Sequence, residues 1–189
     1  MDKQPELITE RLVSRPFALS DAPVVQELAG DRAIAASTGT IPHPYEDGMA
    51  EGWIGTHRQA FEEDKEAVFA ITLREGGSLI GRIGLTIDRS HERAELGYWI
   101  GKPYWGNGYC TEAARAVVQF GFEDLELNRI YATHFARNPA SGRVMAKTGM
   151  TREGCRRQHF QKWGVLEDLI TYAILRSEFG SQSAGAFVP

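Results

Sequence analysis

The sequence predicts a single α/β domain whose sheet contains strands in mixed directions, and three observations predict that fold class. The chain has 189 residues, which is enough for one sizeable hydrophobic core and too short for two comfortable domains. Apolar residues make up 42% of it and charged residues 24%, the balance of a globular protein rather than a disordered one. Strand-like runs joined by a hairpin alternate with helical runs, so antiparallel pairs and helical crossovers should share one sheet.

The elements of the N-terminal half follow from periodicity and from helix-start signals. Residues 9–16 are expected to form a strand, and Ser20-Asp21 is expected to cap a helix that runs to about residue 28. A second helix is predicted over residues 46–63. Five side chains should lie near one of its faces, namely Met49, Trp53, His57, Ala60 and Phe61.

Three strand-like runs come next. Residues 67–74 lead into a Gly76-Gly77-Ser78 turn and then into a strand over residues 79–88, which together are typical of a hairpin. Two sets of residues alternate along this second strand, Ile83, Leu85 and Ile87 against Arg82, Gly84 and Thr86. The third run covers residues 94–100.

The C-terminal half begins with a predicted helix over residues 111–125. Its polar residues step by three or four positions and so form one narrow exposed stripe of Glu112, Arg115, Gln119 and Glu123. The other side chains are free to face a sheet, which predicts a buried crossover helix, and they are Ala113, Ala114, Val117, Val118, Phe120, Phe122 and Leu125. A strand over 129–136, a helix over 139–147, and strands near 151–160 and 166–175 follow. We assign residues 1–179 to one domain and the small, polar residues 180–189 to a poorly ordered tail.

Composition and charge exclude several classes of protein. The formal net charge of −4, from 21 basic and 25 acidic residues, argues against non-specific nucleic-acid binding. No apolar run approaches the roughly 18 residues of a membrane span, and the N-terminal residues lack the apolar region of a secretory signal. Two cysteines, Cys110 and Cys155, are too few for a disulfide scaffold. We therefore expect a reduced, cytoplasmic protein without nucleic-acid or membrane partners, and the histidine spacing indicates no metal site.

The segment from Gly101 to Thr111 is the most informative part of the chain. It leaves a strand, carries glycines at 101, 106 and 108, and opens directly into the buried helix. Glycines accept positive φ, and successive main-chain N–H groups beside a helix N-terminus can bind a phosphate or pyrophosphate. Spacing alone leaves open both this interpretation and a turn without a ligand. The Walker and dinucleotide fingerprints fit poorly, because Pro103 replaces the hydroxyl residue of the first and Thr111 replaces the third glycine of the second.

Two motifs around this turn resemble those of a known family. The stretch ELGYWI at residues 95–100, followed by PYWGNGYCTEA at 103–113, closely resembles motif A of the GNAT N-acetyltransferases. Downstream, Asn138-Pro139-Ala140-Ser141, Val144 and KTGM at 147–150 resemble the motif that follows it. Together they are similar to the ribosomal-protein N-acetyltransferase (RimJ/RimL-like) branch, and the order of elements fits from residue 7 to about 176.

The resemblance implies an acetyl-CoA-dependent N-acetyltransferase with a centrally splayed mixed sheet flanked by helices. It implies that the pyrophosphate lies on the loop and the first helical turn, at Trp105, Gly106, Asn107, Gly108, Tyr109, Cys110 and Thr111. The pantetheine arm would pair with the strand edge at Tyr98, Trp99 and Ile100. Asn138 would contact the cofactor as well as cap its helix. Trp105 and Cys110 depart from the general superfamily pattern, but the main chain would supply these contacts.

Acetyl transfer to an amine requires a neutral amine, a stabilised oxyanion and a leaving thiolate. Glu95 is the first candidate for the base, because the resemblance places it on the motif strand beside the acetyl group; the alternative is a solvated strand carboxylate. Ser141 matches the hydroxyl position that is proposed in the family to contact or protonate the CoA sulfur. A main-chain N–H of residues 98–100 would meet the oxyanion. Glu112 is explained by the helix dipole alone.

Other polar and aromatic side chains have simpler structural interpretations. His134 is expected to be a satisfied core histidine, although it could line the cleft. Neither cysteine has a local histidine partner, so a thiol nucleophile is not expected. A basic cluster should form a solvated strand face, namely Arg152, Arg156 and Arg157. Three aromatic residues could shape an acceptor pocket but should serve core packing, namely Tyr45, Trp53 and Phe61.

The sequence and the resemblance together predict acetyl transfer from acetyl-CoA to a primary amine by direct attack. The resemblance alone favours a protein N-terminal α-amine as the acceptor. A small-molecule amine such as a polyamine, an aminoglycoside or an amino acid is the second hypothesis, and a CoA-binding module without catalysis is the third. Residues 30–65 should decide between the acceptors. A homodimer is compatible with this branch, although no sequence feature demonstrates one.

Overall fold

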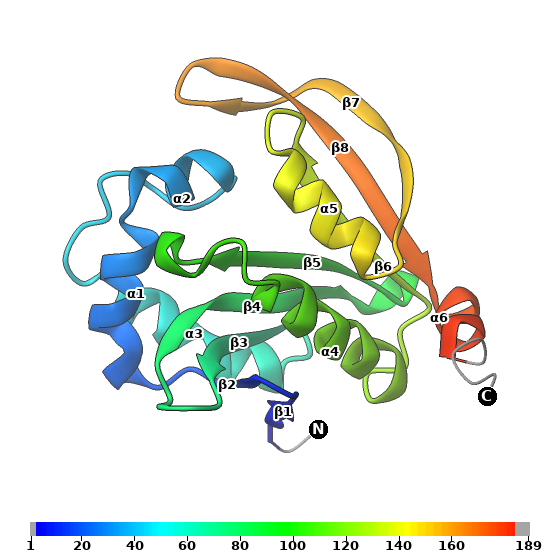
Figure 1. Cartoon of the computed structure of the whole chain (residues 1–189), viewed down its shortest axis with the longest axis horizontal. Helices are drawn as coiled ribbons and strands as arrows, with labels where there is room; N and C mark the ends of the chain where they lie inside the picture. The colour runs from blue at the N-terminus through cyan, green and yellow to red at the C-terminus, as the bar shows by residue number, and fades with distance from the viewer. Residues whose placement is uncertain (1–2, 184–189) are drawn as a thin grey trace.

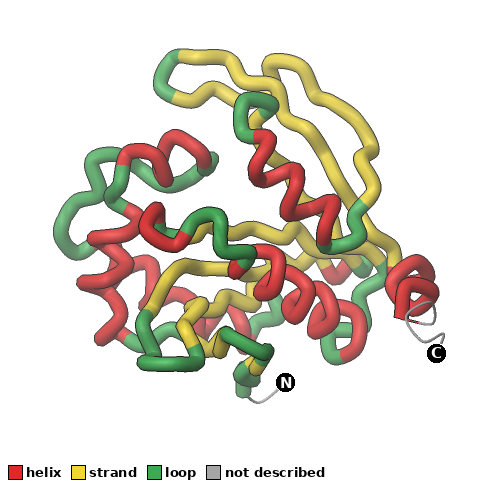
Figure 2. Tube along the Cα trace, in the orientation of Figure 1, coloured by secondary structure: helices red, strands yellow, loops and turns green. Residues whose placement is uncertain are grey.

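An eight-stranded sheet forms the centre of the protein, and helices cover both of its faces (Figures 1 and 2). The computed structural model describes residues 3–183. The strands are β1 (Leu7–Ile8), β2 (Leu12–Pro16), β3 (Glu66–Leu73), β4 (Leu79–Asp88), β5 (Arg93–Ile100), β6 (Arg129–Phe135), β7 (Thr151–Lys162) and β8 (Val165–Leu175). The helices are α1 (Ala22–Ala29), α2 (Arg32–Ser37), α3 (Met49–Glu62), α4 (Tyr109–Glu123), α5 (Pro139–Lys147) and α6 (Arg176–Ser183).

The sheet splays apart between its two central strands. The strand order is β1-β2-β3-β4-β5-β6-β8-β7, and β5 and β6 run parallel while the other neighbours run antiparallel. The parallel pair is joined through α4, as a parallel connection requires. It covers just Arg93–Glu95 against Arg129–Tyr131, whereas β5 stays paired with β4 as far as Ile100. Beyond Glu95, β5 therefore has a free edge, and the centrally splayed mixed sheet that the resemblance implies is confirmed.

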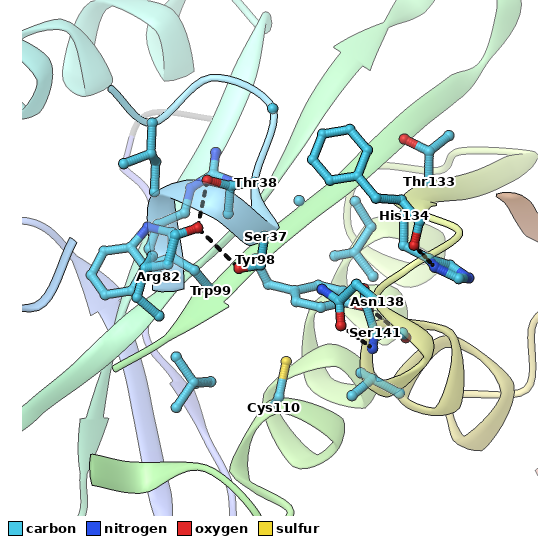
Figure 3. A pocket seen from close by; sticks show the side chains of 18 of the residues that line it. Ser37, Thr38, Arg82, Tyr98, Trp99, Cys110, Thr133, His134, Asn138 and Ser141 are labelled. Atoms are coloured by element: carbon cyan, nitrogen blue, oxygen red, sulfur yellow. Dashed lines mark hydrogen bonds between the residues drawn. The ribbon is translucent and has the colours of Figure 1, made fainter. Parts of the chain in front are cut away.

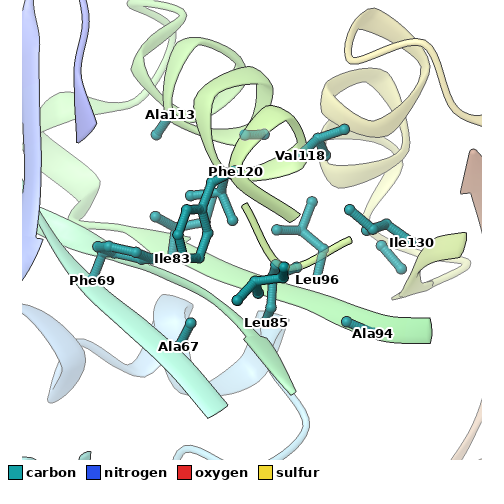
Figure 4. Close-up of a cluster of buried hydrophobic side chains, with 14 of the residues drawn as sticks. Ala67, Phe69, Ile83, Leu85, Ala94, Leu96, Ala113, Val118, Phe120 and Ile130 are labelled. Atoms are coloured by element: carbon teal, nitrogen blue, oxygen red, sulfur yellow. The ribbon is translucent and has the colours of Figure 1, made fainter. Parts of the chain in front are cut away.

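Two apolar clusters bury both faces of the central strands. One lies between α4 and strand residues that include Ile83 and Leu85 (Figure 4). The other lies between strand residues Ala70 and Trp99 and the helices α1, α2 and α3. Because side chains alternate along a strand, neighbouring residues of β4 and β5 face different clusters. A charged side chain in these two strands consequently needs a specific reason to be there.

Helix α4 matches the predicted pattern closely. All the side chains that were expected to face the sheet are buried, from Ala113 to Leu125. Along the predicted polar stripe, Arg115, Gln119 and Glu123 are exposed and Glu112 is half-buried. The helix begins two residues earlier than expected, at Tyr109 directly after Gly108.

The N-terminal strand and the first helix start differ from the prediction. Of the expected strand over 9–16, only residues 12–16 are strand (β2), and β1 lies before it; residues 9–11 form the turn between them, where the main-chain N–H of Thr9 donates to the carbonyl of Leu12 at 2.9 Å. Asp21 stands at the N-cap position of α1 but does not cap it. Its carboxylate instead pairs with Arg15 at 2.7 Å and accepts the N–H of Ala18 at 2.8 Å.

The helices between residues 30 and 65 also depart from the expectation. The short helix α2 was not predicted, and Asp31 caps it by accepting the N–H of Ala33 at 2.7 Å. Helix α3 begins at Met49, after Gly48 with φ of +82°, rather than at residue 46. It buries Ala50, Ile54, His57 and Phe61, so the buried face is turned by about one residue from the predicted one.

The C-terminal elements follow the prediction as far as β8. Helix α6 then runs to Ser183, so residues 180–183 of the expected tail are helical. The remainder of that expected tail, residues 184–189, lies outside the described residues.

Candidate active site

A cavity of about 1180 Å³ opens where β5 and β6 diverge (Figure 3). The sequence-predicted site residues line it with one exception, and those that do are Glu95, Tyr98, Trp99, Ile100, Trp105, Gly106, Gly108, Tyr109, Cys110, Thr111, Asn138 and Ser141. The exception is Asn107, whose amide donates back to the carbonyls of Tyr104 and Trp105. The splay thus brings together residues that lie more than forty positions apart in the chain.

The loop between β5 and α4 forms an open cradle of main-chain N–H groups. Gly106 and Gly108 both have φ of +80°, a conformation that favours glycine. Within residues 3–183, none of the N–H groups from Gly106 to Thr111 donates a hydrogen bond, and the first that does is the N–H of Glu112. No atom lies within 4 Å of the position that a Cβ of Gly106 would take. These free donors at the start of a 15-residue helix fit a pyrophosphate.

Two positive side chains of α5 belong to the same cavity. Arg143 and Lys147 both line it. On the strand side, the indole N–H of Trp105 donates to the carbonyl of Ile100 at 2.6 Å, which fixes the loop to the end of β5. The predicted CoA cradle and the free edge of β5 therefore form one continuous surface.

A hydroxyl pair lies on the α4 and α5 side of β5. The phenol of Tyr98 donates to the carbonyl of Ser141 at 3.0 Å and lies 2.9 Å from the Ser141 hydroxyl (Figure 3). Asn138 caps α5 by accepting the N–H of Ser141 at 3.4 Å, as its position predicts. Burial raises the pKa of Tyr98, so its phenol stays protonated and can donate. Burial also raises the pKa of Cys110 to about 12, which keeps this neighbouring thiol neutral.

The side-chain role of Tyr98 was not foreseen, because sequence reasoning assigned only its main chain. A signal was present in the strand period. Residues 95 and 98 are three positions apart on one strand, so their side chains point to opposite faces. Tyr98 therefore had to face the helix that carries Ser141 if Glu95 faced the other way.

Glu95 lies on the opposite face of β5 from this pair. Its half-buried carboxylate accepts hydrogen bonds from the Thr133 hydroxyl at 3.2 Å and from the Tyr131 phenol at 3.5 Å. Both donors come from β6, at the point where the two strands separate. Glu112 is different, because its carboxylate is held by the hydroxyl of Thr9 at 2.7 Å and by Arg11. It ties the N-terminal segment to α4 and lies outside the cavity lining.

The histidine, the basic cluster and the aromatic residues that were expected to have structural roles lie partly in the cavity lining. His134 lines the cavity, but its Nδ1 lies 2.9 Å from the Phe135 carbonyl and its ring lies against Tyr172. In the basic cluster, Arg156 lines the cavity beside His159, while Arg152 and Arg157 are exposed on β7. Of the three aromatic residues, Tyr45 and Trp53 line the cavity as well as packing against the second cluster, and Phe61 packs in the first.

Arg82 is a cavity-lining cation that sequence reasoning missed. It lies on β4 opposite Trp99 of β5, on the face that Glu95 also occupies. In Figure 3, Arg82 and Trp99 lie on one side of Tyr98, and Ser141 lies on the other. The α3 side chain His57 is buried nearby, and burial, with a smaller effect of Arg82, lowers the pKa of His57 to about 4.

Two distant segments meet across the top of the cavity. The Lys162 ammonium, at the end of β7, donates to the carbonyls of Gly39 and Ile41 at 3.1 and 2.9 Å. Arg137, just after β6, donates to the carbonyl of Ala36 at 2.7 Å. We call these contacts the roof, because residues on both sides of them line the cavity below.

No helix within residues 3–183 is both long and apolar enough to cross a membrane. In the same part of the chain, no three His, Cys, Asp or Glu side chains are grouped as they would be to hold a metal ion.

Comparisons of the sequence and of the structure with known proteins all find acetyltransferases. Residues 11–151 match the family described as acetyltransferase (GNAT) domain. The uncharacterized N-acetyltransferase YoaA of Bacillus subtilis (strain 168) is 32% identical over 173 residues, covering 91% of this chain and 97% of the relative. The solved acetyltransferase (GNAT family) of Bacillus anthracis has a TM-score of 0.82 at 28% identity, covering 92% of this chain and 99% of that one. RimL, a ribosomal L7/L12 α-N-protein acetyltransferase solved with coenzyme A, shares the fold with a TM-score of 0.84 at 17% identity, covering 90% and 98%.

Proposed function

The chain belongs to the GNAT acetyltransferase family and is an acetyl-CoA-dependent N-acetyltransferase, and we propose that its acceptor is the α-amine of a protein N-terminus. One observation carries the proposed arrangement of the reaction. Glu95 and the Tyr98–Ser141 pair lie on opposite faces of β5, at the point where the sheet splays. A proton can therefore leave on one side of the strand and be supplied on the other.

The residues of the cradle are proposed to hold the cofactor. The free N–H groups of residues 106–111 would bind its pyrophosphate, with Arg143 and Lys147 adding positive charge. Acetyl-CoA, when bound, supplies a thioester carbonyl that a neutral amine can attack directly. Main-chain N–H groups on the free edge of β5 would hold the carbonyl oxygen and stabilise negative charge on it.

Glu95 is the proposed base, directly or through a water molecule. An α-amine has a pKa near 7.7–8.0, so removing its proton at pH 7 costs only about 1–1.4 kcal/mol, against about 4.6 kcal/mol for a lysine. A single carboxylate that accepts two hydroxyl hydrogen bonds is a sufficient base for deprotonating an α-amine. The same carboxylate can attract the amine in its charged form before the proton leaves.

The Tyr98–Ser141 pair is proposed to act on the leaving group. Its hydroxyls lie on the face of β5 toward α5, where the Asn138 cap fixes the start of the helix that carries Ser141. Free thiols titrate near about 8.5, so the departing sulfur needs only a hydrogen bond or a proton from such a donor. The raised pKa of Tyr98 keeps a proton available there at neutral pH.

The charges around the cavity support an acceptor with a single amine. The acidic side chains in its lining are Glu66 and Glu95, and the permanently cationic ones are Arg82, Arg143, Lys147 and Arg156. With Arg143 and Lys147 assigned to the cofactor, Arg82 and Arg156 remain to repel the additional positive charges of a polyamine or an aminoglycoside. This balance favours a peptide N-terminus or an amino acid over the polycationic acceptors.

Two finer expectations are part of the same proposal. We propose a cytoplasmic location, which agrees with Cys110 and Cys155 being free thiols. A homodimer is also proposed, and light scattering coupled to size-exclusion chromatography measures it directly.

The test is an acetylation assay with three amines, followed by mass spectrometry. They are a lysine-free peptide with a free N-terminus, an N-terminally blocked peptide with one lysine, and spermidine. We expect the first to have the highest kcat/KM. Glu95→Gln should lower that kcat/KM by about 10²–10⁴-fold, as is usual for a lost general base.

The matched control is Glu75→Gln, which removes the same charge in the turn between β3 and β4 and should leave the rate unchanged. A higher kcat/KM for spermidine or for the lysine peptide would refute the proposed acceptor. An unchanged rate in Glu95→Gln would remove Glu95 as the base.

A further inference from the structure

The guanidinium of Arg82 lies in a notch made by two glycines. Gly84 of β4 and Gly97 of β5 are opposite each other in the strand register, on the same face as Arg82. A Cβ on Gly97 would come within 2.8 Å of Arg82 Nη1, and one on Gly84 within 3.3 Å of Nη2. The guanidinium therefore extends from its own strand across this glycine pair toward the splay. Residues with side chains at these two positions would occupy the space that it fills.

The guanidinium of Arg82 has no hydrogen-bond or ion-pair partner within residues 3–183. Its side chain forms no ion pair and no hydrogen bond there, and its Nε is fully buried. Glu66 and Glu95 share the same face of the sheet, and Glu66 attracts the guanidinium electrostatically, but neither carboxylate forms an ion pair with it. His57 is held neutral by its low pKa and also has no hydrogen-bond partner. Burying an unpaired charge is unfavourable, and arginine does not escape by losing its proton.

The cofactor does not account for Arg82. The phosphate cradle lies after the C-terminal end of β5, at the start of α4, and the α5 cations Arg143 and Lys147 line the same cavity. Arg82 lies on the other face of the sheet, on the side covered by α1, α2 and α3. Glu95, the proposed base, lies on this same face, two residues before Gly97.

We infer that Arg82 binds a carboxylate of the acceptor, so that the preferred substrates are amines that carry a negatively charged group. Such a substrate would place its carboxylate on the guanidinium at Gly97 and its amine toward Glu95. A guanidinium can donate two parallel hydrogen bonds to a carboxylate, which fixes the orientation of the ligand as well as its position. Arg82 is thus a specificity-determining residue for the acceptor.

This inference rests on the proposed transfer of an acetyl group to an α-amine and adds a requirement for a carboxylate in the acceptor. The carboxylate has two sources, the α-carboxylate of a free amino acid or an acidic side chain next to a peptide N-terminus. The experiment therefore uses two matched pairs of acceptors. The first pair is L-alanine and L-alaninamide, and the second is a peptide amide that begins Ala-Asp and its counterpart that begins Ala-Asn. In each pair only one carboxylate is replaced by an amide.

The measurement is kcat/KM for each acceptor with wild type and with Arg82→Met, which keeps a long apolar stem without the charge. We expect Arg82→Met to lower kcat/KM for the acidic member of one pair by about 10- to 100-fold, and to lower kcat/KM for its amide partner far less. The ratio within a pair is compared between the two proteins, so differences in amine pKa cancel. The pair that responds identifies the source of the carboxylate.

Two further variants separate charge from folding. Gly97→Ala keeps the arginine but places a methyl group against its guanidinium and against no other atom within 4 Å, so it should also weaken the acidic acceptor selectively. Arg157→Met removes an equal charge from the exposed face of β7 and should change neither pair. Unaltered acetyl-CoA binding shows that each variant is folded.

A binding measurement keeps this inference separate from the proposed reaction. In the CoA-bound protein, the acidic member of the responding pair should raise the unfolding temperature more than its amide, and Arg82→Met should abolish that difference. This holds whether or not the amine is acetylated, so absence of turnover would count against the proposed acceptor alone. Equal binding and equal rates for acid and amide in both pairs, or an equal loss of both in Arg82→Met, would overturn the role of Arg82.

Discussion

Replacing Gly106 by alanine adds one methyl group to the cradle and so tests whether the cradle binds the cofactor. Gly106 has φ of +80°, and no atom lies within 4 Å of the position that a Cβ would take. The substitution therefore causes no clash inside the protein and costs only left-handed backbone strain, about 1–2 kcal/mol. For a chain of this size that corresponds to a fall in Tm of roughly 2–8 °C.

The same methyl group should weaken cofactor binding, because Gly106 lines the cavity and its N–H belongs to the cradle. We expect a loss of about tenfold in acetyl-CoA affinity, equivalent to about 1.4 kcal/mol. At 100 times the wild-type Kd, acetyl-CoA stabilises wild type by about 2.7 kcal/mol and would stabilise the variant by about 1.4 kcal/mol. The corresponding rises in Tm are roughly 5–11 °C and roughly 3–6 °C.

The matched control is Gly76→Ala in the turn between β3 and β4. Gly76 has φ of +78° and an equally open surrounding, but it lies outside the cavity lining. Both variants should lower the Tm of the free protein alike, and only Gly106→Ala should lose part of the rise caused by acetyl-CoA. Thermal unfolding with and without the ligand measures both quantities. An equal ligand-induced rise in the two variants would refute the assignment of the cradle.

Two other predictions concern a hydroxyl and a histidine. Tyr98→Phe removes the donor to Ser141 and should lower kcat about tenfold or more with little change in the KM for acetyl-CoA; steady-state kinetics with an unchanged kcat would contradict it. Burial, and to a smaller extent Arg82, lowers the pKa of His57 from 6.5 to about 4. Between these pH values the unfolded chain binds a proton that the folded chain excludes, so stability should fall with falling pH by up to about 3 kcal/mol. Urea unfolding near pH 7 and near pH 5 should show this loss reduced in His57→Gln but retained in His91→Gln, and an equal loss in both would contradict the reasoning.

Periodic elements could be predicted from the sequence because one strong pattern decided them. Helix α4 has a single polar stripe, and hydrophobic burial places the apolar side chains between Ala113 and Phe122 against the sheet, where all but Ala116 are buried. The short helix α2 gave no such signal, since six residues form fewer than two turns and depend on the Asp31 cap. Asp21 was expected to serve as a cap because of its position, but an arginine six residues earlier in the chain offered its carboxylate a stronger partner.

The parts of the candidate site that come from a single segment could be predicted from the sequence. The parts that form between distant segments could not. The cradle lies within a single loop, so glycine spacing and resemblance were enough to find it. The contact of Tyr98 with Ser141 depends on how α5 crosses the sheet, which no local pattern contains. Arg82 depends on strand register, because only the pairing of β4 with β5 sets Gly84 opposite Gly97. The alternation along residues 79–88 shows which residues of this strand share a face with Arg82. It does not show which residues of the neighbouring strands lie beside Arg82 on that face.

The roof over the cavity has a consequence for the shape of a protein acceptor. The sheet closes the cavity below, and Lys162 and Arg137 close it above by holding residues 36–41. For the proposed protein acceptor, the amine has to reach Glu95 beneath these contacts, and an extended tail of a few residues fits there more easily than a folded surface. The roof therefore favours polypeptides whose first residues are unstructured, and it would exclude those whose N-terminus is packed into a helix or sheet. The enzyme would then choose its acceptors by the local disorder of their N-terminal residues as much as by their sequence.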